Sequence, residues 1–255
     1  PGPGAKGTGT VAIKNYDAWQ KIEVKMDTLA ENKEIDTTFK MFGKSFKYPI
    51  FAGPVGAVSQ HYSDLYNDNS FNEIYVRACA KSGIAAFTGD GLNEEIMIHA
   101  THAIKENNGI GVPTIKPWDK DTCFKKLDLA NESNAFAIAM DIDAAGLPFL
   151  QGRIPPAGRK SVEELKEIID CAHVPFIVKG IMSVEGAQKA IDAGAKAIVV
   201  SNHGGRVLDG TPATACVLEE IADQFKGRVK IIVDGGIRSG LDVFKALALG
   251  ADAVI

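Results

Sequence analysis

The stretch AGAKAIVVSNHGGR at residues 193–206, together with its partial copy LGADAVI at residues 249–255, indicates the fold. In each copy a glycine ends a helical periodicity, and a short apolar run follows directly. A glycine at this place closes a helix in the left-handed conformation. A repeated helix-to-strand corner is typical of an internally repetitive βα fold.

The second half of the chain continues this rhythm. Its apolar runs are short and lack polar alternation, which predicts parallel strands covered on both faces. The predicted strands are Val174–Lys179, Ala195–Ser201, Val229–Asp234 and Asp252–Ile255. N-cap or first-turn residues predict helix starts between the strands. In chain order these are Ser161, with Glu164 completing a capping box, Ser183, Pro212 and Ser239.

The first half shows the same alternation less clearly. A hairpin is predicted to turn at Gly43, and two helices are predicted from about Phe71 to Ser82 and from about Asn93 to Asn107. The predicted strands are Tyr48–Ala52, Ile84–Thr88, Gly111–Ile115 and Ala135–Asp141. Eight parallel strands in 255 residues predict an α/β fold of the (β/α)8 TIM-barrel type. A doubly wound sheet and a division into two smaller domains are the alternatives.

Both ends of the chain depart from the barrel pattern. We assign residues 39–255 to the barrel and residues 1–38 to an N-terminal extension that is partly flexible, because Pro1-Gly2-Pro3-Gly4 is typical of coil. The last apolar run stops at Ile255, where the pattern calls for one more helix. We therefore expect a barrel that is incomplete after strand eight, with the final helix and C-terminal segment missing.

Composition excludes several classes of protein. A net charge of -4 argues against nucleic acid as a partner, because nucleic-acid binders usually carry a basic face. Apolar runs long enough to span a bilayer and a charged-then-apolar leader are both absent from the sequence. The widely spaced cysteines argue against a disulfide framework, and we expect free thiols in a cytoplasmic protein. They are Cys79, Cys123, Cys171 and Cys216.

Polar residues collect at the predicted strand ends. In barrels of this type the functional groups lie at the carboxyl ends of the strands. These ends carry, in chain order, Gly53–Gly56, Thr88–Gly91, Lys116, Asp141, Lys179, Ser201–Arg206 and Asp234–Arg238. We therefore expect one polar rim above an apolar barrel.

Three features of this rim point to chemistry. Lys179 ends an apolar strand, where a buried ammonium needs an anionic partner. We predict that it has a functional role, the alternative being a lysine that only forms a salt bridge in the core. Asp234–Arg238 is either a tight turn or an anion cradle of backbone N–H groups. His203 with Arg206 forms a base-and-anchor pair, the alternative being a structural histidine. His99 and His102 lack acidic companions, so we interpret them as surface residues and predict no metal site.

The run Ser201–Arg206, followed by Asp209 and Pro212-Ala213-Thr214, resembles the active-site signature of the FMN-dependent 2-hydroxy-acid dehydrogenase and oxidase family. Glycolate oxidase, lactate oxidase and mandelate dehydrogenase are members. Phe176–Gly180, Asp234–Arg238 and Asp242–Ala251 extend the resemblance, which is nearly continuous from Ser161 and looser between Phe39 and Asp141.

This resemblance implies FMN as cofactor and a small (S)-2-hydroxy acid, lactate-like or glycolate-like, as substrate. It makes His203 the general base, Asp141 the carboxylate that orients it, and Arg206 the anchor of the substrate carboxylate. The implied flavin-binding residues are Pro54, Val55, Gly56, Thr88, Lys179 and Ser201 at the ring, and Asp234, Gly235, Gly236, Ile237 and Arg238 at the ribityl phosphate. Oxygen or another carrier would accept the electrons. Family members are often tetramers, which implies a homotetramer.

Several positions depart from the family pattern. The strand-three end lacks the usual glutamine and tyrosine, and Lys116 is our candidate for a substitute cation. Asp143-Ala144-Ala145-Gly146 lacks the second substrate arginine, and the second phosphate segment would lie beyond Ile255. Two alternatives remain open. One is a different FMN or phosphate-binding barrel enzyme, such as a type 2 isopentenyl diphosphate isomerase or an inosine-monophosphate dehydrogenase. The other is an inactive barrel fragment.

Overall fold

The computed structural model describes residues 4–62 and 64–255, and in this part of the chain eight strands form one sheet. Each strand pairs in parallel with its neighbour in sequence, which confirms the predicted (β/α)8 barrel. The strands are β3 (Phe51–Val55), β4 (Ala85–Thr88), β5 (Gly111–Ile115), β6 (Ile138–Asp141), β7 (Phe176–Ile181), β8 (Ala197–Val200), β9 (Lys230–Val233) and β10 (Ala253–Val254). A parallel bridge between Ile50 and Val254 brings the first and last strands together.

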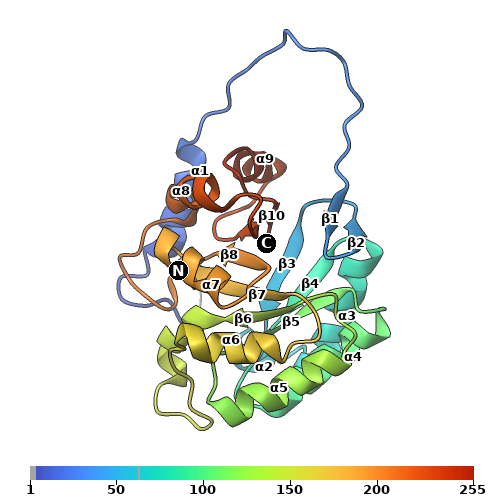
Figure 1. Cartoon of the computed structure of the whole chain (residues 1–255), viewed down its shortest axis with the longest axis vertical. Coiled ribbons are helices and arrows are strands. Elements are labelled where there is room, and N and C mark those ends of the chain that lie inside the picture. Colours follow the sequence, from blue (N-terminus) through green and yellow to red (C-terminus); the bar gives the residue numbers. More distant parts are fainter. Residues whose placement is uncertain (1–3, 63) are drawn as a thin grey trace.

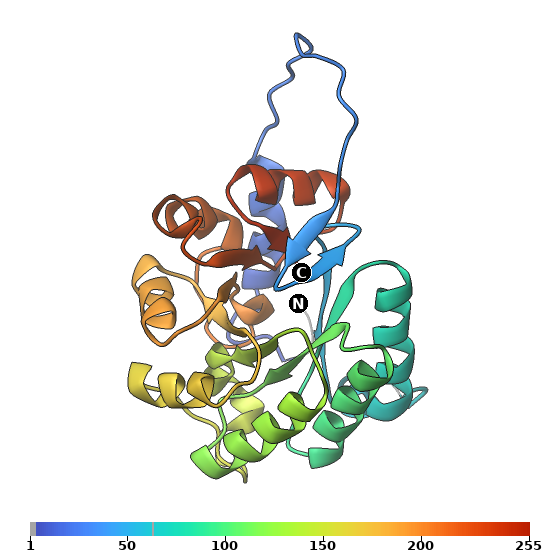
Figure 2. The ribbon, with the colours of Figure 1, turned by 45° about the vertical axis from the view of Figure 1, so that its right-hand side comes forward.

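Helices surround this sheet on the outside (Figures 1 and 2). They are α2 (Val58–His61), α3 (Asp68–Lys81), α4 (Glu94–Glu106), α5 (Lys120–Glu132), α6 (Val162–Asp170), α7 (Val184–Asp192), α8 (Thr214–Phe225) and α9 (Gly240–Ala248). The predicted caps at Ser161, Ser183 and Ser239 are confirmed, because each hydroxyl accepts a backbone N–H from the first helical turn. Pro212 was predicted in a first turn, but it precedes Ala213, the N-cap of α8. None of the described helices has the length and apolar character that a membrane span requires.

Aromatic side chains fill the amino-terminal end of the barrel. The predicted hairpin at Gly43 is present as β1 (Phe39–Met41) and β2 (Lys44–Phe46). Phe46 packs edge-on against Phe51, with the ring centroids 5.1 Å apart, and lies 5.3 Å from Phe136. The polar groups lie at the opposite end, where the strands finish.

The N-terminal segment contributes a helix that the periodicity did not reveal. Helix α1 (Val11–Lys21) packs on the barrel with Trp19 buried, and the Trp19 indole donates a hydrogen bond of 2.8 Å to the Gly235 carbonyl. Residues 22–38 then leave the barrel as a long exposed loop (Figures 1 and 2). Of the predicted Pro-Gly coil, Pro1, Gly2 and Pro3 lie outside the described residues. The domain boundary at residue 39 stays a prediction.

Strand β3 begins and ends later than predicted. The sequence suggested Tyr48–Ala52, with Gly53-Pro54 as a strand end, whereas the observed strand is Phe51–Val55. The pairing of β3 with β4 shifts register between Ala52 and Val55. A proline is tolerated in a strand at such an irregularity, because the ladder does not use its missing N–H group.

Candidate active site

Two cavities at the carboxyl ends of the strands contain most of the predicted site residues. One, of about 50 Å³, is lined by Pro54, Val55, Gly56, Lys116, Asp141, His203 and Arg206 among others. The other, of about 280 Å³, is lined by Pro54, Asp234, Gly235, Gly236, Ile237 and Arg238 among others. Pro54 lines both cavities, so they lie side by side. Thr88, Lys179 and Ser201 are buried outside these linings: Thr88 ends β4, Lys179 lies within β7, and Ser201 directly follows β8.

Lys179 has the anionic partners that its burial requires. Only 3% of the residue is exposed, and its Nζ lies 3.0 Å from Asp234 Oδ2 and 3.6 Å from Asp141 Oδ1. It also donates a hydrogen bond of 2.8 Å to Ser201 Oγ. Burial lowers the pKa of Lys179, but Asp234, Asp141 and Asp143 raise it by more, so that it lies above its ordinary value. The ammonium is therefore charged at neutral pH.

Asp141 is shared between two ammonium groups. Its Oδ2 lies 3.8 Å from Lys116 Nζ, on the side away from the contact with Lys179. Burial raises the pKa of Asp141, but Lys179, His203 and Lys116 outweigh this effect and leave the pKa below its usual value. The carboxylate is thus ionised and partly neutralised by the two lysines.

A buried network that the sequence did not reveal holds Lys116. The Lys116 backbone N–H donates 3.0 Å to Asp90 Oδ2, and the Trp118 indole donates 2.6 Å to the same oxygen. Lys126 forms an ion pair with the other carboxylate oxygen of Asp90. Because Asp90 and Lys126 are 36 positions apart on different elements, no spacing rule could have paired them.

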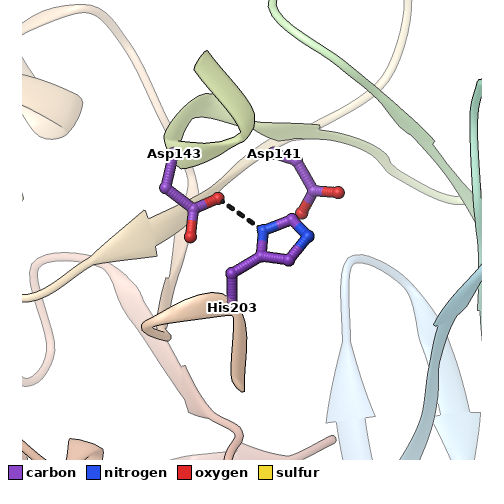
Figure 3. Close-up of side chains that lie close together, drawn as sticks. All are labelled: Asp141, Asp143 and His203. Atoms are coloured by element: carbon purple, nitrogen blue, oxygen red, sulfur yellow. Dashed lines mark hydrogen bonds and ion pairs between the residues drawn. The ribbon is translucent and has the colours of Figure 1, made fainter. Parts of the chain in front are cut away.

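His203 is held in a sparsely populated conformation. Its φ is +55°, in the left-handed region, and its backbone N–H donates 3.2 Å to Ser201 Oγ. The ring atom Nδ1 lies 3.0 Å from Oδ1 of Asp143, a residue of the short 3-10 helix η1 (Ile142–Gly146) (Figure 3). Asp141 faces the same ring without a dashed contact (Figure 3). The sequence analysis singled out Asp141 and missed Asp143, although two carboxylates two positions apart at the end of a strand were a visible signal.

Arg206 faces the smaller cavity as a cation without a carboxylate partner among the described residues. Its Nε is buried and has no hydrogen-bond partner there, and its guanidinium lies 5.7 Å from the centroid of Phe149. His61 lines the same cavity. Burial lowers the pKa of His61, and the nearby cations Arg206 and Lys116 lower it further, while Asp68 acts in the opposite direction. The guanidinium of Arg206, whose Nε is unpartnered among the described residues, suits an anion.

The larger cavity has the form of a cofactor cradle. Gly235 and Gly236 have φ of +88° and +83°, and a Cβ at Gly236 would lie 2.5 Å from the backbone carbonyl carbon of Asn15 on α1. Only glycine fits here, since both conformation and space exclude a side chain. Asp234 Oδ1 is buried without a partner among the described residues. An orphaned polar atom beside a glycine turn fits a ligand with hydroxyl and phosphate groups.

The cysteines and one of the two histidines of α4 fit the sequence-based interpretation. His102 is exposed, whereas His99 is half-buried and lies 3.3 Å from Glu95 on the same helix, an acidic companion that the sequence analysis did not recognise. The four cysteines are free, with Cys79 and Cys123 buried. Asp141, Asp143 and His203 bring one ligand-type atom each to within 4.8 Å of one another. Because Lys179 already neutralises part of this charge, we interpret the group as an ion-paired site, and the absence of a metal site stays a prediction.

The chain is similar to proteins of one family. The family model described as FMN-dependent dehydrogenase matches residues 3–153 and 149–255. A peroxisomal (S)-2-hydroxyacid oxidase of Arabidopsis thaliana is 53% identical over 96 residues, which cover 38% of this chain and 26% of that protein. An L-lactate oxidase of Lactobacillus jensenii is 55% identical over 97 residues, covering 38% and 23%. The matched stretch is thus about a quarter of the length of these curated relatives.

Solved structures agree over nearly the whole chain. An arginine-to-leucine variant of mandelate oxidase, with 2-hydroxy-phenylacetamide, superimposes with a TM-score of 0.82 at 27% identity, covering 99% of this chain and 77% of that one. A lactate oxidase described as putative, of Pediococcus acidilactici, gives 0.81 at 29% identity, covering 99% and 74%. A further mandelate oxidase structure carries an FMN adduct.

Proposed function

Because the chain belongs to the FMN-dependent dehydrogenase family, we propose that it forms the active centre of an enzyme that oxidises a small (S)-2-hydroxy acid to the 2-oxo acid. The observation that supports this proposal most directly is that His203 and Arg206 line the same cavity. The buried Lys179 contacts Asp141, which lines that cavity too. The names of the relatives, which are oxidases of hydroxy acids and of lactate, support the same substrate class.

The cradle fits FMN. In this proposal Asp234–Arg238 would hold the ribityl chain and the phosphate, and Gly235 and Gly236 let this turn pack closely against Asn15 of α1. Pro54, Val55, Gly56, Thr88, Lys179 and Ser201 would surround the ring. When bound, FMN supplies an acceptor for the hydride equivalent of the substrate. Lys179 supplies a fixed positive charge at this place, which favours an electron-rich neighbour.

His203 is the proposed base. Its Nδ1 is committed to a carboxylate, so its Nε2 carries the lone pair that takes the proton of the substrate hydroxyl. The positive charge that the ring gains lies close to two carboxylates, those of Asp143 and Asp141 (Figure 3). General base catalysis of this kind contributes roughly 10²- to 10⁴-fold to a rate.

Arg206 is the proposed anchor of the substrate carboxylate. Its guanidinium offers paired donors in the geometry of a carboxylate, and Phe149 holds it from one side. Lys116 is the proposed second cation, since its Nζ is 3.8 Å from Asp141 and lines the same cavity. On the family resemblance we propose a short substrate, such as lactate or glycolate.

The test is anaerobic reduction of the FMN-loaded chain. Lactate, glycolate and longer 2-hydroxy acids are mixed with the protein, and loss of the yellow flavin absorbance is followed in time. We expect bleaching with at least one short acid, and a loss of at least about 100-fold in its rate in His203→Ala with the flavin retained. A matched His102→Ala variant, changed on the exposed face of α4, should behave as the original chain. Unchanged absorbance with every acid would refute the proposal.

The electron acceptor, the assembly and the location belong to the same proposal. The relatives include both oxidases and an L-lactate dehydrogenase of Ectopseudomonas mendocina, so we propose oxygen or another carrier as acceptor. We also propose a homotetramer, on the family resemblance, and a cytoplasmic protein, on the four free thiols.

A further inference from the structure

We propose that Asp143, not Asp141, is the positioning residue that holds the His203 imidazole ready to accept a proton. This inference rests on the proposed function, because it concerns the base of that reaction. The hydrogen bond of the ring runs from Nδ1 to Asp143 Oδ1 at 3.0 Å (Figure 3). Both side chains are mostly buried, with 11% of each exposed, so water competes little for this contact.

Asp141 has another task. Its two oxygens lie 3.6 Å from the Lys179 ammonium and 3.8 Å from the Lys116 ammonium. The carboxylate is thus spread between two cations, and it acts on the imidazole through space. A carboxylate engaged in this way stabilises positive charge nearby but does not select which ring nitrogen carries the proton.

The backbone makes room for Asp143 at one residue. Gly180 in β7 has a φ of +103°, and the pairing of β7 with β8 shifts register between Lys179 and Ile181. A Cβ at Gly180 would lie 2.4 Å from Asp143 Cγ and 2.7 Å from its Oδ1. An irregular strand with a left-handed glycine therefore lets the Asp143 carboxylate reach His203.

One ammonium ties the two halves of the pair together. Lys6 Nζ donates to the carbonyl of Gly146, the last residue of η1, at 3.2 Å, and to the carbonyl of Val207 at 3.0 Å. Helix η1 carries Asp143, and Val207 follows the His203–Arg206 segment by one position. The contact fixes the segment with the carboxylate against the segment with the imidazole.

The chemical consequence concerns the tautomer of His203. An ionised carboxylate only accepts hydrogen bonds, so it selects the form protonated at Nδ1 and leaves Nε2 as the base. An asparagine at position 143 offers an NH₂ donor as well, which stabilises the opposite form with the proton on Nε2. The same exchange in a serine-protease triad costs roughly 10⁴-fold in rate because of the wrong tautomer.

The experiment reads this tautomer by NMR on the 255-residue chain with ¹⁵N-labelled histidines. The chain has five histidines, and His203→Gln identifies the signals of His203. At the alkaline end of a pH series we expect the original chain to show Nδ1 protonated and Nε2 free. Asp143→Asn should move the proton toward Nε2, while the matched variant Asp141→Asn should leave it on Nδ1. If Asp143→Asn does not fold, as judged by circular dichroism, Asp143→Ala replaces it and should likewise lose the bias toward Nδ1.

Two results would overturn the inference: an unchanged tautomer in the Asp143 variants, or a switched one in Asp141→Asn. A second measurement separates it from the proposed function. Anaerobic flavin reduction should fall by about 10²- to 10⁴-fold in Asp143→Asn, with KM for the acid nearly unchanged. A switched tautomer in a chain whose flavin no hydroxy acid reduces supports the positioning role of Asp143 and refutes only the oxidation.

Discussion

Replacing Lys179 by methionine tests the charge arrangement without reference to any ligand. Lys179 Nζ lies 3.0 Å from Asp234 and 3.6 Å from Asp141, in a residue that is 3% exposed. At an effective dielectric constant of about 20, each contact is worth roughly 5 kcal/mol of gross Coulomb energy. The net cost is smaller than the gross energy because burying the charges costs desolvation, but it still amounts to about 3–5 kcal/mol, since removing one partner leaves buried carboxylates unpaired. We expect the free energy of unfolding at pH 7 to fall by that amount.

The pH dependence of this loss has a defined sign. In the folded original chain the pKa of Asp141 is lowered, because Lys179, His203 and Lys116 outweigh the opposing effect of burial. A lowered carboxyl pKa gives stability that is present above the ordinary value of about 3.9 and is lost as the pH falls through the folded value. Without Lys179 this stabilisation shrinks, and the unpaired carboxylates become easier to protonate. The difference in stability between the two proteins should therefore be largest near neutrality and narrow as the pH falls toward 4.

The assay is urea unfolding followed by circular dichroism, from pH 7 to pH 4. Lys166→Met is the matched control, because Lys166 pairs with Asp170 at 3.0 Å with 56% and 59% of the side chains exposed. An exposed pair of this kind contributes about 0–1 kcal/mol. A loss below about 1 kcal/mol in Lys179→Met, or a loss that does not change with pH, would show that Lys179 does not hold these carboxylates together.

Two further predictions concern the cradle and the thiols. Gly236→Ala should displace α1, because the new Cβ would lie 2.5 Å from the Asn15 backbone. In a Trp118→Phe background, where Trp19 is the remaining tryptophan, the displacement should shift the fluorescence of Trp19 to the red. The control Gly152→Ala changes a glycine that also has a positive φ but has nothing within 4 Å, and it should leave the fluorescence unchanged. Two of the four cysteines, Cys171 and Cys216, are exposed and should react rapidly with a thiol reagent at pH 8. Cys79 and Cys123 should not, because burial raises the pKa of Cys123 to about 11 and also raises that of Cys79. More than two rapidly reacting thiols in the folded chain would contradict the described burial.

The regular part of the fold could be predicted because burial imposes a period on the sequence. β5 was predicted with its observed bounds, Gly111–Ile115, and the caps of α6 and α9 were read from their serines. Parallel strands read as continuous apolar runs, which single residues rarely disturb. Their carboxyl ends must then share one rim, so spacing alone placed His203 and Lys179 near each other.

The parts that escaped prediction depend on contacts between distant residues. Helix α5 buries only a narrow stripe, including Cys123 and Leu127, within a polar segment, so its periodicity is weak. The ion pair between Lys126 and Asp90 joins two segments that are far apart in the sequence, and no sequence motif predicts this contact. Helix α1 is fixed by Trp19 reaching Gly235, across most of the chain. Such pairings follow from the folded geometry and carry no local signal.

The two aspartates at the end of β6 have different neighbours at the barrel mouth. Asp141 lies beside the ammonium groups of Lys116 and Lys179, whereas Asp143 lies beside the imidazole of His203. Lys179 also lies beside Asp234, so the charges of the two lysines and their carboxylate neighbours partly offset one another before any ligand binds. Among the described residues Arg206 lacks a carboxylate partner, which leaves it to the incoming anion. In the proposed reaction the Arg206 guanidinium would offset the negative charge of the substrate carboxylate. Proton transfer from the substrate hydroxyl would place a positive charge on His203, 3.0 Å from Asp143, while the electron pair would leave with the hydride equivalent, so the net charge of the site and its ligands stays the same.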